Sequence, residues 1–178
     1  SHIGSKHESS KENFQKPPPQ QTVYINQPTS KTNQYHQNQQ EKQEKPIKIC
    51  NWNVRGLNDS KKRAQIRELA SSLCDILVIT ETHSDASNIH DIQSSLEKNS
   101  TFTINSSTVS GGVGVVALNP RLTIIKAYEN DSGTILDASI TDSVAEFTFH
   151  VRGVYAPSYS NQKRLSFFSN EITAGLTD

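Results

Sequence analysis

Apolar residues follow two patterns along the chain, a helix between two strands and then strands alone. Residues 47–56 are too few for a helix and end on Gly56, which predicts a strand running into a turn. Residues 75–80 are nearly all apolar and β-branched, as in a strand covered on both faces. Between them, residues 61–73 follow the capping cluster 58–60 and have apolar positions near helical spacing. This order predicts a right-handed crossover between parallel strands, whose helix buries Ala64, Ile66, Leu69, Ala70 and Leu73.

The pattern changes after Glu81. Residues 82–88 are polar and predict a loop at the rim of the sheet, and residues 88–96 predict a short helix. Residues 161–173 predict a last helix with Leu165, Phe168 and Ile172 on its buried side. A crossover followed by antiparallel hairpins favours an α/β (α+β) fold with helices outside a mixed sheet. Apolar runs between turn residues predict the hairpin strands at 101–105, 112–118, 122–128, 134–140 and 145–155, the last with Phe147, Phe149, Val151, Gly153 and Tyr155 on one face.

Composition divides the chain into two regions. Residues 1–46 hold five of the seven prolines, nine glutamines and no arginine. Such a segment buries too little apolar surface to offset its backbone entropy, so we expect a disordered Gln/Asn/Pro/Lys-rich tail. Its residues 1–5 fit a cloning remnant and native low-complexity sequence equally well. Residues 47–178 are enough for a domain core, and no run has the roughly 20 apolar residues of a membrane span.

The two cysteines, Cys50 and Cys74, lie in or beside predicted core elements. Buried free thiols are favoured over a disulfide there. This preference indicates a reducing, intracellular compartment.

Polar residues stand where three predicted strands end. Asn51 and Asn53 are two apart and so share a face of the first strand. Glu81 directly follows the buried strand, and Tyr155 closes the last one. A carboxylate at such a rim suits Mg²⁺, which takes one or two carboxylates with water and substrate phosphate, while amide and phenol groups can hydrogen-bond the phosphate. The pattern favours metal-assisted hydrolysis of a phosphodiester.

Each of these residues also has a structural interpretation. Glu81 equally fits a solvated carboxylate at a strand end, Asn53 an amide that stabilises a turn, and Tyr155 a core or rim aromatic. Only their combination in a fixed context points to a site.

Four segments supply that context. They are Lys48-Ile-Cys-Asn-Trp-Asn-Val-Arg-Gly56, Asp75-Ile-Leu-Val-Ile-Thr-Glu-Thr82, Gly111-Gly-Val-Gly-Val-Val116 and Gly153-Val-Tyr-Ala-Pro157. In this order and at these separations they resemble the N-terminal half of the endonuclease/exonuclease/phosphatase superfamily. Residues 53–58, Lys61-Lys-Arg63 and Glu81-Thr-His83 are most similar to the apurinic-endonuclease-like domains of non-LTR (LINE-type) retrotransposons. The resemblance implies a four-layer sandwich of two mixed β-sheets flanked by helices, truncated after about the first half, with residues 47–178 as a partial domain.

The resemblance also implies roles for residues at matching positions. Asn53 takes the place of the active-site asparagine, Glu81 that of the ligand to Mg²⁺ (or Mn²⁺), and Tyr155 that of the tyrosine that contacts the scissile phosphate. Asn51, Arg55 and Ser158 are the candidate substrate contacts. Arg55 stands where apurinic endonucleases often carry an aspartate, so a second metal-associated carboxylate is missing, as it also is in retrotransposon relatives. Ser158 stands where the family often has an asparagine.

The family pattern continues beyond these segments. It includes Gly-Asp-x-Asn, a further aspartate and a terminal Ser-Asp-His, none of which occurs before Asp178. His83, His90 and His150 are poor substitutes, and a surface or structural role is favoured for each. We therefore expect the 178-residue chain alone to have little or no nuclease activity.

Bulk charge does not favour nucleic-acid binding. Residues 47–178 hold 12 Lys and Arg against 14 Asp and Glu, so any attraction for phosphate must be local. The cations at 61–63 oppose the dipole of their helix, a cost that an anionic partner would relieve. Two candidate patches of positive charge are present, one made of Lys61, Lys62, Arg63 and Arg67 and the other of Lys163 and Arg164. For each patch the alternative is an ordinary solvated helix face.

Three interpretations follow. The first is the Mg²⁺-dependent DNA endonuclease domain of a LINE-type element, with DNA as its partner, no membrane role and a nuclear location. The second is a phosphodiesterase or phosphatase of the same superfamily, acting on RNA tails, inositol phosphates or lipid head groups. The third is a non-catalytic remnant that serves as a binding module.

Overall fold

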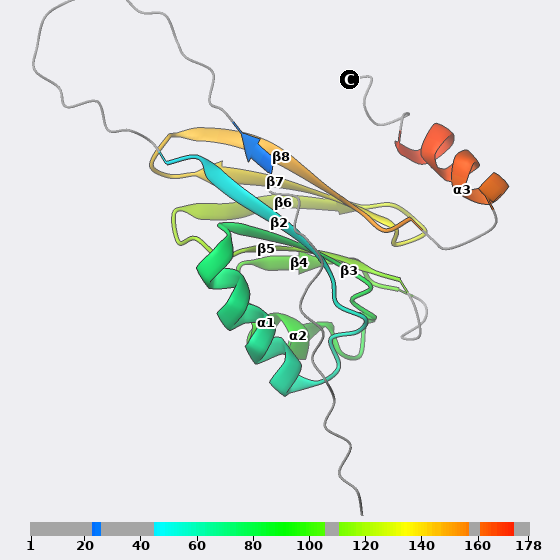
Figure 1. Cartoon of the computed structure of the whole chain (residues 1–178), viewed down its shortest axis with the longest axis horizontal. Helices are drawn as coiled ribbons and strands as arrows, with labels where there is room; N and C mark the ends of the chain where they lie inside the picture. Colours follow the sequence, from blue (N-terminus) through cyan, green and yellow to red (C-terminus); the bar gives the residue numbers. More distant parts are fainter. Residues whose placement is uncertain (1–22, 26–44, 106–110, 157–160, 173–178) are drawn as a thin grey trace, which may run out of the picture.

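Two β-sheets packed face to face make up most of the computed structural model, and helices cover the outer face of the larger sheet (Figure 1). The structure describes residues 23–25, 45–105, 111–156 and 161–172. This architecture confirms the predicted α/β (α+β) sandwich. Within the described residues, no helix has the length and apolarity needed to cross a membrane.

The larger sheet is mixed. Its strands lie in the order β1-β2-β3-β5-β4, with β2 and β3 parallel and the other neighbours antiparallel. Helix α1 (Ser60–Leu73) joins β2 to β3 and begins where Asp59 Oδ1 accepts the backbone N–H of Lys61 at 2.8 Å. The predicted crossover is therefore confirmed. The strands are β1 (Val23–Ile25), β2 (Ile47–Asn53), β3 (Ile76–Thr80), β4 (Ser100–Phe102) and β5 (Val113–Ala117).

Strand β1 comes from the segment expected to be a disordered tail. It pairs antiparallel with the start of β2, with Val23 opposite Ile49. The rest of residues 1–44 lies outside the described residues, so the boundary at residue 46 stays a prediction. A pairing between segments more than 20 residues apart leaves no trace in local composition.

Helix α1 buries two of the five residues expected, Ile66 and Ala70, and exposes the other three. Its buried residues are Arg63, Ile66 and Ala70, whereas Leu69 is 39% and Leu73 is 40% exposed, and Ala64 is exposed as well. The helix packs on α2 (Ile89–Leu96) as well as on the sheet, and the Arg63 guanidinium donates to Ser95 Oγ of α2. The second contact turns the buried stripe toward Arg63.

The smaller sheet is antiparallel throughout the described residues. It contains β6 (Leu122–Glu129), β7 (Ile135–Asp142) and β8 (Phe147–Val154), joined as successive hairpins. The predicted inner face of β8 is confirmed, because Phe147, Phe149, Val151 and Tyr155 all pack in the core between the sheets.

The last helix was predicted with the wrong buried side. Helix α3 (Asn161–Phe167) continues into a π-helical turn, η1 (Phe168–Ile172). Leu165 is 70% and Phe168 is 45% exposed, whereas Phe167 is 8% exposed. Leu165 lies in α3, before η1, so the wider π-helical turn can change the helical phase only from Phe168 onward.

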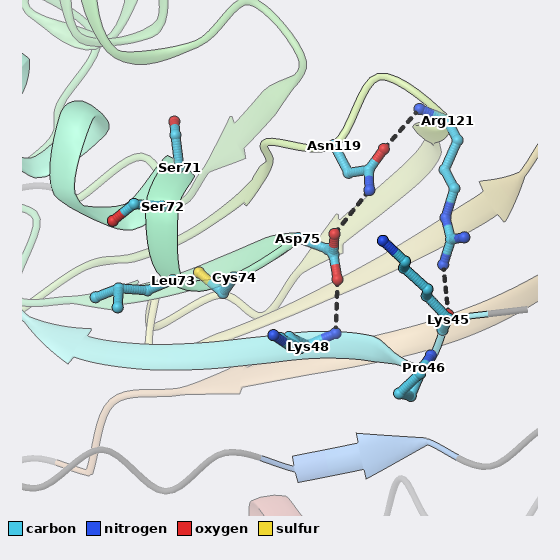
Figure 2. Close-up of a pocket in the computed structure, with 10 residues that line it drawn as sticks. All are labelled: Lys45, Pro46, Lys48, Ser71, Ser72, Leu73, Cys74, Asp75, Asn119 and Arg121. Atoms are coloured by element: carbon cyan, nitrogen blue, oxygen red, sulfur yellow. Dashed lines mark hydrogen bonds between the residues drawn. The ribbon is translucent and has the colours of Figure 1, made fainter.

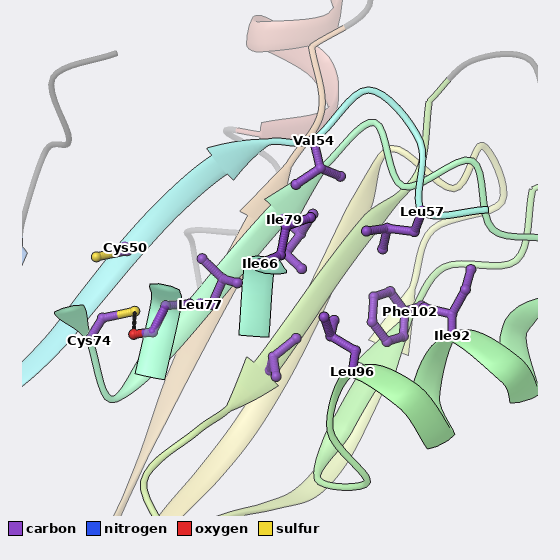
Figure 3. Close-up of a cluster of buried hydrophobic side chains, with 12 residues drawn as sticks. Cys50, Val54, Leu57, Ile66, Cys74, Leu77, Ile79, Ile92, Leu96 and Phe102 are labelled. Atoms are coloured by element: carbon purple, nitrogen blue, oxygen red, sulfur yellow. Dashed lines mark hydrogen bonds between the residues drawn. The ribbon is translucent and has the colours of Figure 1, made fainter. Parts of the chain in front are cut away.

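A second apolar core lies between the mixed sheet and the helices α1 and α2, and it contains both cysteines (Figure 3). Cys50 and Cys74 are buried free thiols, as predicted. Burial, followed by a hydrogen bond with Cys50, raises the pKa of the Cys74 thiol to about 12. Cys74 is therefore a neutral thiol at physiological pH.

Candidate functional site

Two of the three predicted site residues, Asn53 and Glu81, stand at one edge of the mixed sheet, and Tyr155 approaches that edge from the end of β8 in the smaller sheet. Asn53 pairs with Thr80 in the parallel register of β2 and β3, so Asn53 and Glu81 stand at the same end of adjacent strands. Strand β5 begins at this edge, because Val113 pairs with Thr80. The ring of Tyr155 also reaches it, since a Cβ added to Gly111 would lie 3.6 Å from Tyr155 Cε1. The predicted convergence of the first and second strands is therefore confirmed.

Glu81 sits in a tightly held segment. Its φ is +55°, in the left-handed region that a glutamate rarely adopts. Its carbonyl accepts the N–H of Gly56 at 2.6 Å, and the next two amides, of Thr82 and His83, donate to Gly112 and Gly111. The half-buried Glu81 carboxylate has no hydrogen bond or ion pair to any described residue. The backbone is fixed while the carboxylate remains available.

Asn53 performs a structural task as well. Its Oδ1 accepts the backbone N–H of Arg55 at 3.2 Å, which stabilises the turn where Arg55 has a φ of +50°. Its Nδ2 has no partner in the described part of the chain, and the residue is exposed. The amide can therefore hold the turn with its oxygen and donate outward with its nitrogen.

Tyr155 is half-buried, and its backbone N–H donates to Thr134 O at 2.8 Å. This bond ties the residue after β8 to the turn between β6 and β7. The ring lies beside Gly111, whose carbonyl accepts the N–H of His83. Gly111 thus links the Glu81 segment to Tyr155.

The predicted substrate contacts are spread along the sheet. Arg55 is exposed at the edge, beside Asn53. Asn51 is exposed farther back on the same face of β2 and lines a groove of about 360 Å³ between β2 and β8. Ser158 lies outside the described residues. The other residues lining this groove are Ile49, Val78, His150, Val151, Arg152 and Val154.

The histidines lie in the surface or structural positions expected of them. His83 packs on Gly56, where an added Cβ would lie 2.9 Å from His83 Nδ1. His90 is exposed on α2, and His150 is exposed on β8 with its Nδ1 3.0 Å from Ser139 Oγ.

No protein-family model and no curated protein matches the chain, but solved structures do. The AP endonuclease LMAP from Leishmania major has a TM-score of 0.51 at 13% identity, over 72% of this chain and 46% of that one. The human Nocturnin catalytic domain has a TM-score of 0.51 at 15% identity, over 91% of this chain and 63% of that one. The 3′ phosphatase NExo from Neisseria has a TM-score of 0.48 at 19% identity, over 74% of this chain and 53% of that one.

The chain has an endonuclease/exonuclease/phosphatase-like fold. It spans between 46% and 63% of the length of these solved structures. At such identities the similarity establishes the fold and leaves the activity to the site itself. The implied fold is thus confirmed, while membership of the superfamily and the narrower similarity to LINE-type domains stay predictions.

The donor set fits a hard cation only in part. Among the described residues, no three His, Cys, Asp or Glu side chains lie together as a metal-ligand cluster. Mg²⁺ does not require one, because it commonly binds one or two carboxylates and completes its shell with water and substrate phosphate. Glu81 with an oxygen-rich substrate meets that condition.

One candidate phosphate contact is structural instead. Arg63 is 8% exposed, and its Nη1 donates to the carbonyls of Leu57 at 2.6 Å and Asn58 at 3.0 Å. The guanidinium holds the loop between β2 and α1, so it cannot belong to an exposed patch. Sequence spacing alone could not separate Arg63 from its exposed neighbour Lys61.

The other candidate cations differ in exposure. Lys61 is exposed, and Lys62 Nζ donates to Arg55 O at 3.2 Å, close to the site edge. Arg67 pairs with Glu97 at 3.3 Å. Arg164 is exposed, and the side chain of Lys163 lies outside the described residues.

A pocket of about 460 Å³ lies at the opposite end of the mixed sheet (Figure 2). Asp75 stands in it, and both of its carboxylate oxygens accept hydrogen bonds, from Lys48 N at 2.8 Å and Asn119 Nδ2 at 2.7 Å. Both oxygens of this carboxylate are already engaged by other segments of the fold, so we place the candidate site at the Glu81 end. The pocket is lined by Lys45, Pro46, Lys48, Ser71, Ser72, Leu73, Cys74, Asp75, Asn119 and Arg121.

Proposed function

We propose that the chain belongs to a divalent-metal-dependent phosphodiester hydrolase that acts on DNA, of the LINE-type endonuclease class. The convergence of Asn53, Glu81 and Tyr155 at one sheet edge, with the Glu81 carboxylate unengaged among described residues, carries the proposal. The similarity to a protein named as an AP endonuclease supports DNA as the substrate. A nuclear location follows from the same proposal.

Each site residue has a separate role, set by the chemistry of its side chain. Glu81 would hold Mg²⁺ or Mn²⁺, and such an ion would supply polarisation of the phosphoryl group and stabilisation of the leaving oxygen. Asn53 donates its Nδ2 hydrogens to a phosphate oxygen while its Oδ1 keeps the turn at Arg55. The Tyr155 phenol donates to the phosphate from the far side, and the exposed Arg55 adds positive charge.

Phosphates beyond the scissile one would lie near the start of α1. Lys61 and Lys62 are the candidate contacts left there, because Arg63 is buried. Reversing both lysines to glutamate should lower the salt dependence of DNA binding by about two in log–log slope. Reversal of Lys126, exposed on β6, is the matched control. An unchanged slope in the double variant would remove the patch from the proposal.

The metal site can be tested on the 178-residue chain. Titration calorimetry with Mn²⁺ should show at least about tenfold weaker binding, or about 1.4 kcal/mol, for Glu81→Gln. Glu146→Gln is a matched control, because Glu146 is exposed and has a left-handed φ of +54°, close to that of Glu81. Equal binding by the wild type and Glu81→Gln would overturn Glu81 as the ligand.

The reaction needs a separate assay. Supercoiled plasmid is incubated with Mg²⁺ and either the 178-residue chain or any longer product of the same gene. We expect little nicking by the chain alone and robust nicking by a product that carries Gly-Asp-x-Asn and Ser-Asp-His. Robust nicking by the chain alone would refute the incomplete site. If the longer product hydrolyses RNA or inositol phosphates and does not nick the plasmid, DNA is not its substrate.

A further inference from the structure

Asn105 lies between the two segments that carry Glu81 and Tyr155. Its backbone N–H donates to Ser84 O at 3.0 Å, three residues after Glu81. A Cβ added to Gly112 would lie 2.5 Å from Asn105 Nδ2, and one added to Gly133 would lie 2.4 Å from Asn105 Oδ1. The Asn105 amide therefore fills a slot between the start of β5 and the β6–β7 turn, and both walls of the slot are glycine.

Buried hydroxyl groups connect this slot to Glu81. Thr82, Ser84 and Thr103 are each 0% exposed. The Thr82 and Ser84 hydroxyls lie 2.7 Å apart, and Ser84 Oγ donates to Thr103 O at 2.8 Å. A Cβ added to Gly112 would lie 2.2 Å from Thr82 Oγ1, so Thr82 and Asn105 meet the same glycine. The network fixes the residues immediately after Glu81 against β5.

The other side of the slot leads to Tyr155. Gly133 belongs to the turn in which Asn130 Oδ1 accepts the N–H of Thr134 at 2.9 Å. Thr134 O accepts the N–H of Tyr155 at 2.8 Å. Displacing the Asn105 amide would therefore loosen the turn that anchors Tyr155.

We infer that Asn105 is a positioning residue that fixes Glu81 and Tyr155 relative to each other. The significance of that spacing rests on the proposed function, since a metal held by Glu81 and a phosphate held by Tyr155 must meet within fractions of an ångström. The Asn105 Nδ2 is buried in the slot without a hydrogen-bond partner among the described residues, a cost that packing alone does not explain. Asn105 touches neither metal nor substrate and acts through its neighbours.

Hydrogen exchange of the 178-residue chain, followed by NMR, tests the coupling directly. In Asn105→Ala, protection of the amides of Thr82, His83 and Tyr155 should fall at least about tenfold, while β2 and β3 amides keep theirs. Asn119→Ala is the matched control, because Asn119 bonds Asp75 at the opposite end of the sheet. It should leave all three amides protected.

Two results would overturn the inference. One is that protection falls only at Thr82 and His83, only at Tyr155, or at none of these three amides. The other is an equal loss at every amide, which would show general destabilisation. Asn105→Ser retains a polar side chain and serves if the alanine variant does not fold, with a smaller loss expected at the same three amides.

A Mn²⁺ titration separates this inference from the proposed function. Asn105→Ala should weaken Mn²⁺ binding about tenfold, as expected for a residue that supports a ligand. If Glu81→Gln weakens binding and Asn105→Ala does not, the link from Asn105 to Glu81 is wrong. If Glu81→Gln has no effect, the proposed metal site fails, and the exchange data alone decide the positioning role.

Discussion

Strand β3 carries an acidic residue at each end, and the two acids are treated differently by the fold. Asp75 precedes the strand, and both of its oxygens accept hydrogen bonds from β2 and from the segment after β5. Glu81 follows the strand, and its carboxylate makes no such bond within the described residues. Both acids sit beside the same buried strand, so position in the sequence does not separate them.

The difference teaches how to separate a structural acid from a candidate functional one. A carboxylate whose two oxygens both accept hydrogen bonds from other segments holds parts of the fold together and has fewer acceptor positions left for a ligand. Glu81 has the opposite features, a left-handed backbone held by two neighbouring segments and a carboxylate at the edge with no partner among the described residues. Glu146 shares the left-handed φ, so it is the position of Glu81 beside Asn53 and Tyr155, together with its unengaged side chain, that favours a functional role over a structural one.

The largest expected effect is on stability at the Asp75 end. Asp75→Ala should reduce the free energy of unfolding by about 2–3 kcal/mol, because the N–H of Lys48 and Nδ2 of Asn119 lose their acceptor. Glu81→Ala should change it by less than about 0.5 kcal/mol. Urea unfolding followed by circular dichroism measures both. Equal losses would show that Glu81 is structural too.

The Glu81 end contains one structural charge, Arg63, which gives the next effect. Arg63→Ala should cost about 2 kcal/mol, because the carbonyls of Leu57 and Asn58 lose a buried donor. Lys61→Ala, on the exposed side of the same turn, should cost under about 0.5 kcal/mol. The same urea experiment applies. If Arg63→Ala changes the free energy of unfolding only slightly, Arg63 is again a candidate phosphate contact.

Backbone strain at Glu81 predicts a gain in stability. Glu81→Gly should stabilise the chain by up to about 1 kcal/mol, because glycine adopts a φ of +55° without steric cost. Glu146→Gly, at a φ of +54° in the β7–β8 turn, should give a similar gain. Thermal unfolding of both variants provides the comparison. A loss at Glu81 beside a gain at Glu146 would mean that the Glu81 side chain stabilises the fold.

The last effect is a pH dependence at the Asp75 end, which is absent at neutral pH and grows only at high pH. The pKa of Cys74 is raised to about 12 by burial and by Cys50, so the folded chain keeps a proton that the unfolded chain releases near pH 8.5. The unfolded state then binds fewer protons, and stability should fall as the pH rises from about 9 toward 12. Urea midpoints of the wild type and Cys74→Ala measure it. If both proteins lose stability equally as the pH rises, the pH dependence belongs to groups other than Cys74.

Local patterns predicted most of the elements, and the misses concern the buried sides of two helices. The crossover β2-α1-β3 follows from the spacing of apolar residues in one short stretch. The buried side of α1 was only partly right, because Arg63 faces a partner in α2, and the buried side of α3 was wrong, because Phe167 is buried there in place of Leu165. The burial of Arg63 depends on a neighbour that periodicity does not describe.

The candidate site divides in the same way. Asn53, Glu81 and Tyr155 could be named from the sequence because each stands next to a strand end. Parallel pairing of β2 and β3 places Asn53 and Glu81 at one edge, whereas the approach of Tyr155 depends on how the second sheet packs on the first. The saturation of Asp75 depends on Asn119, 44 residues away, and the slot around Asn105 depends on glycines in two other segments. Such contacts form only when distant segments pack.

The sequence alone therefore determined the order of the elements and the chemistry available at each strand end, since both depend on neighbours along the chain. Only the tertiary structure decided which acid is satisfied, which arginine is buried and what holds Glu81 near Tyr155. Those outcomes depend on hydrogen-bond partners and steric limits contributed by residues far apart in the sequence, and no local pattern records them.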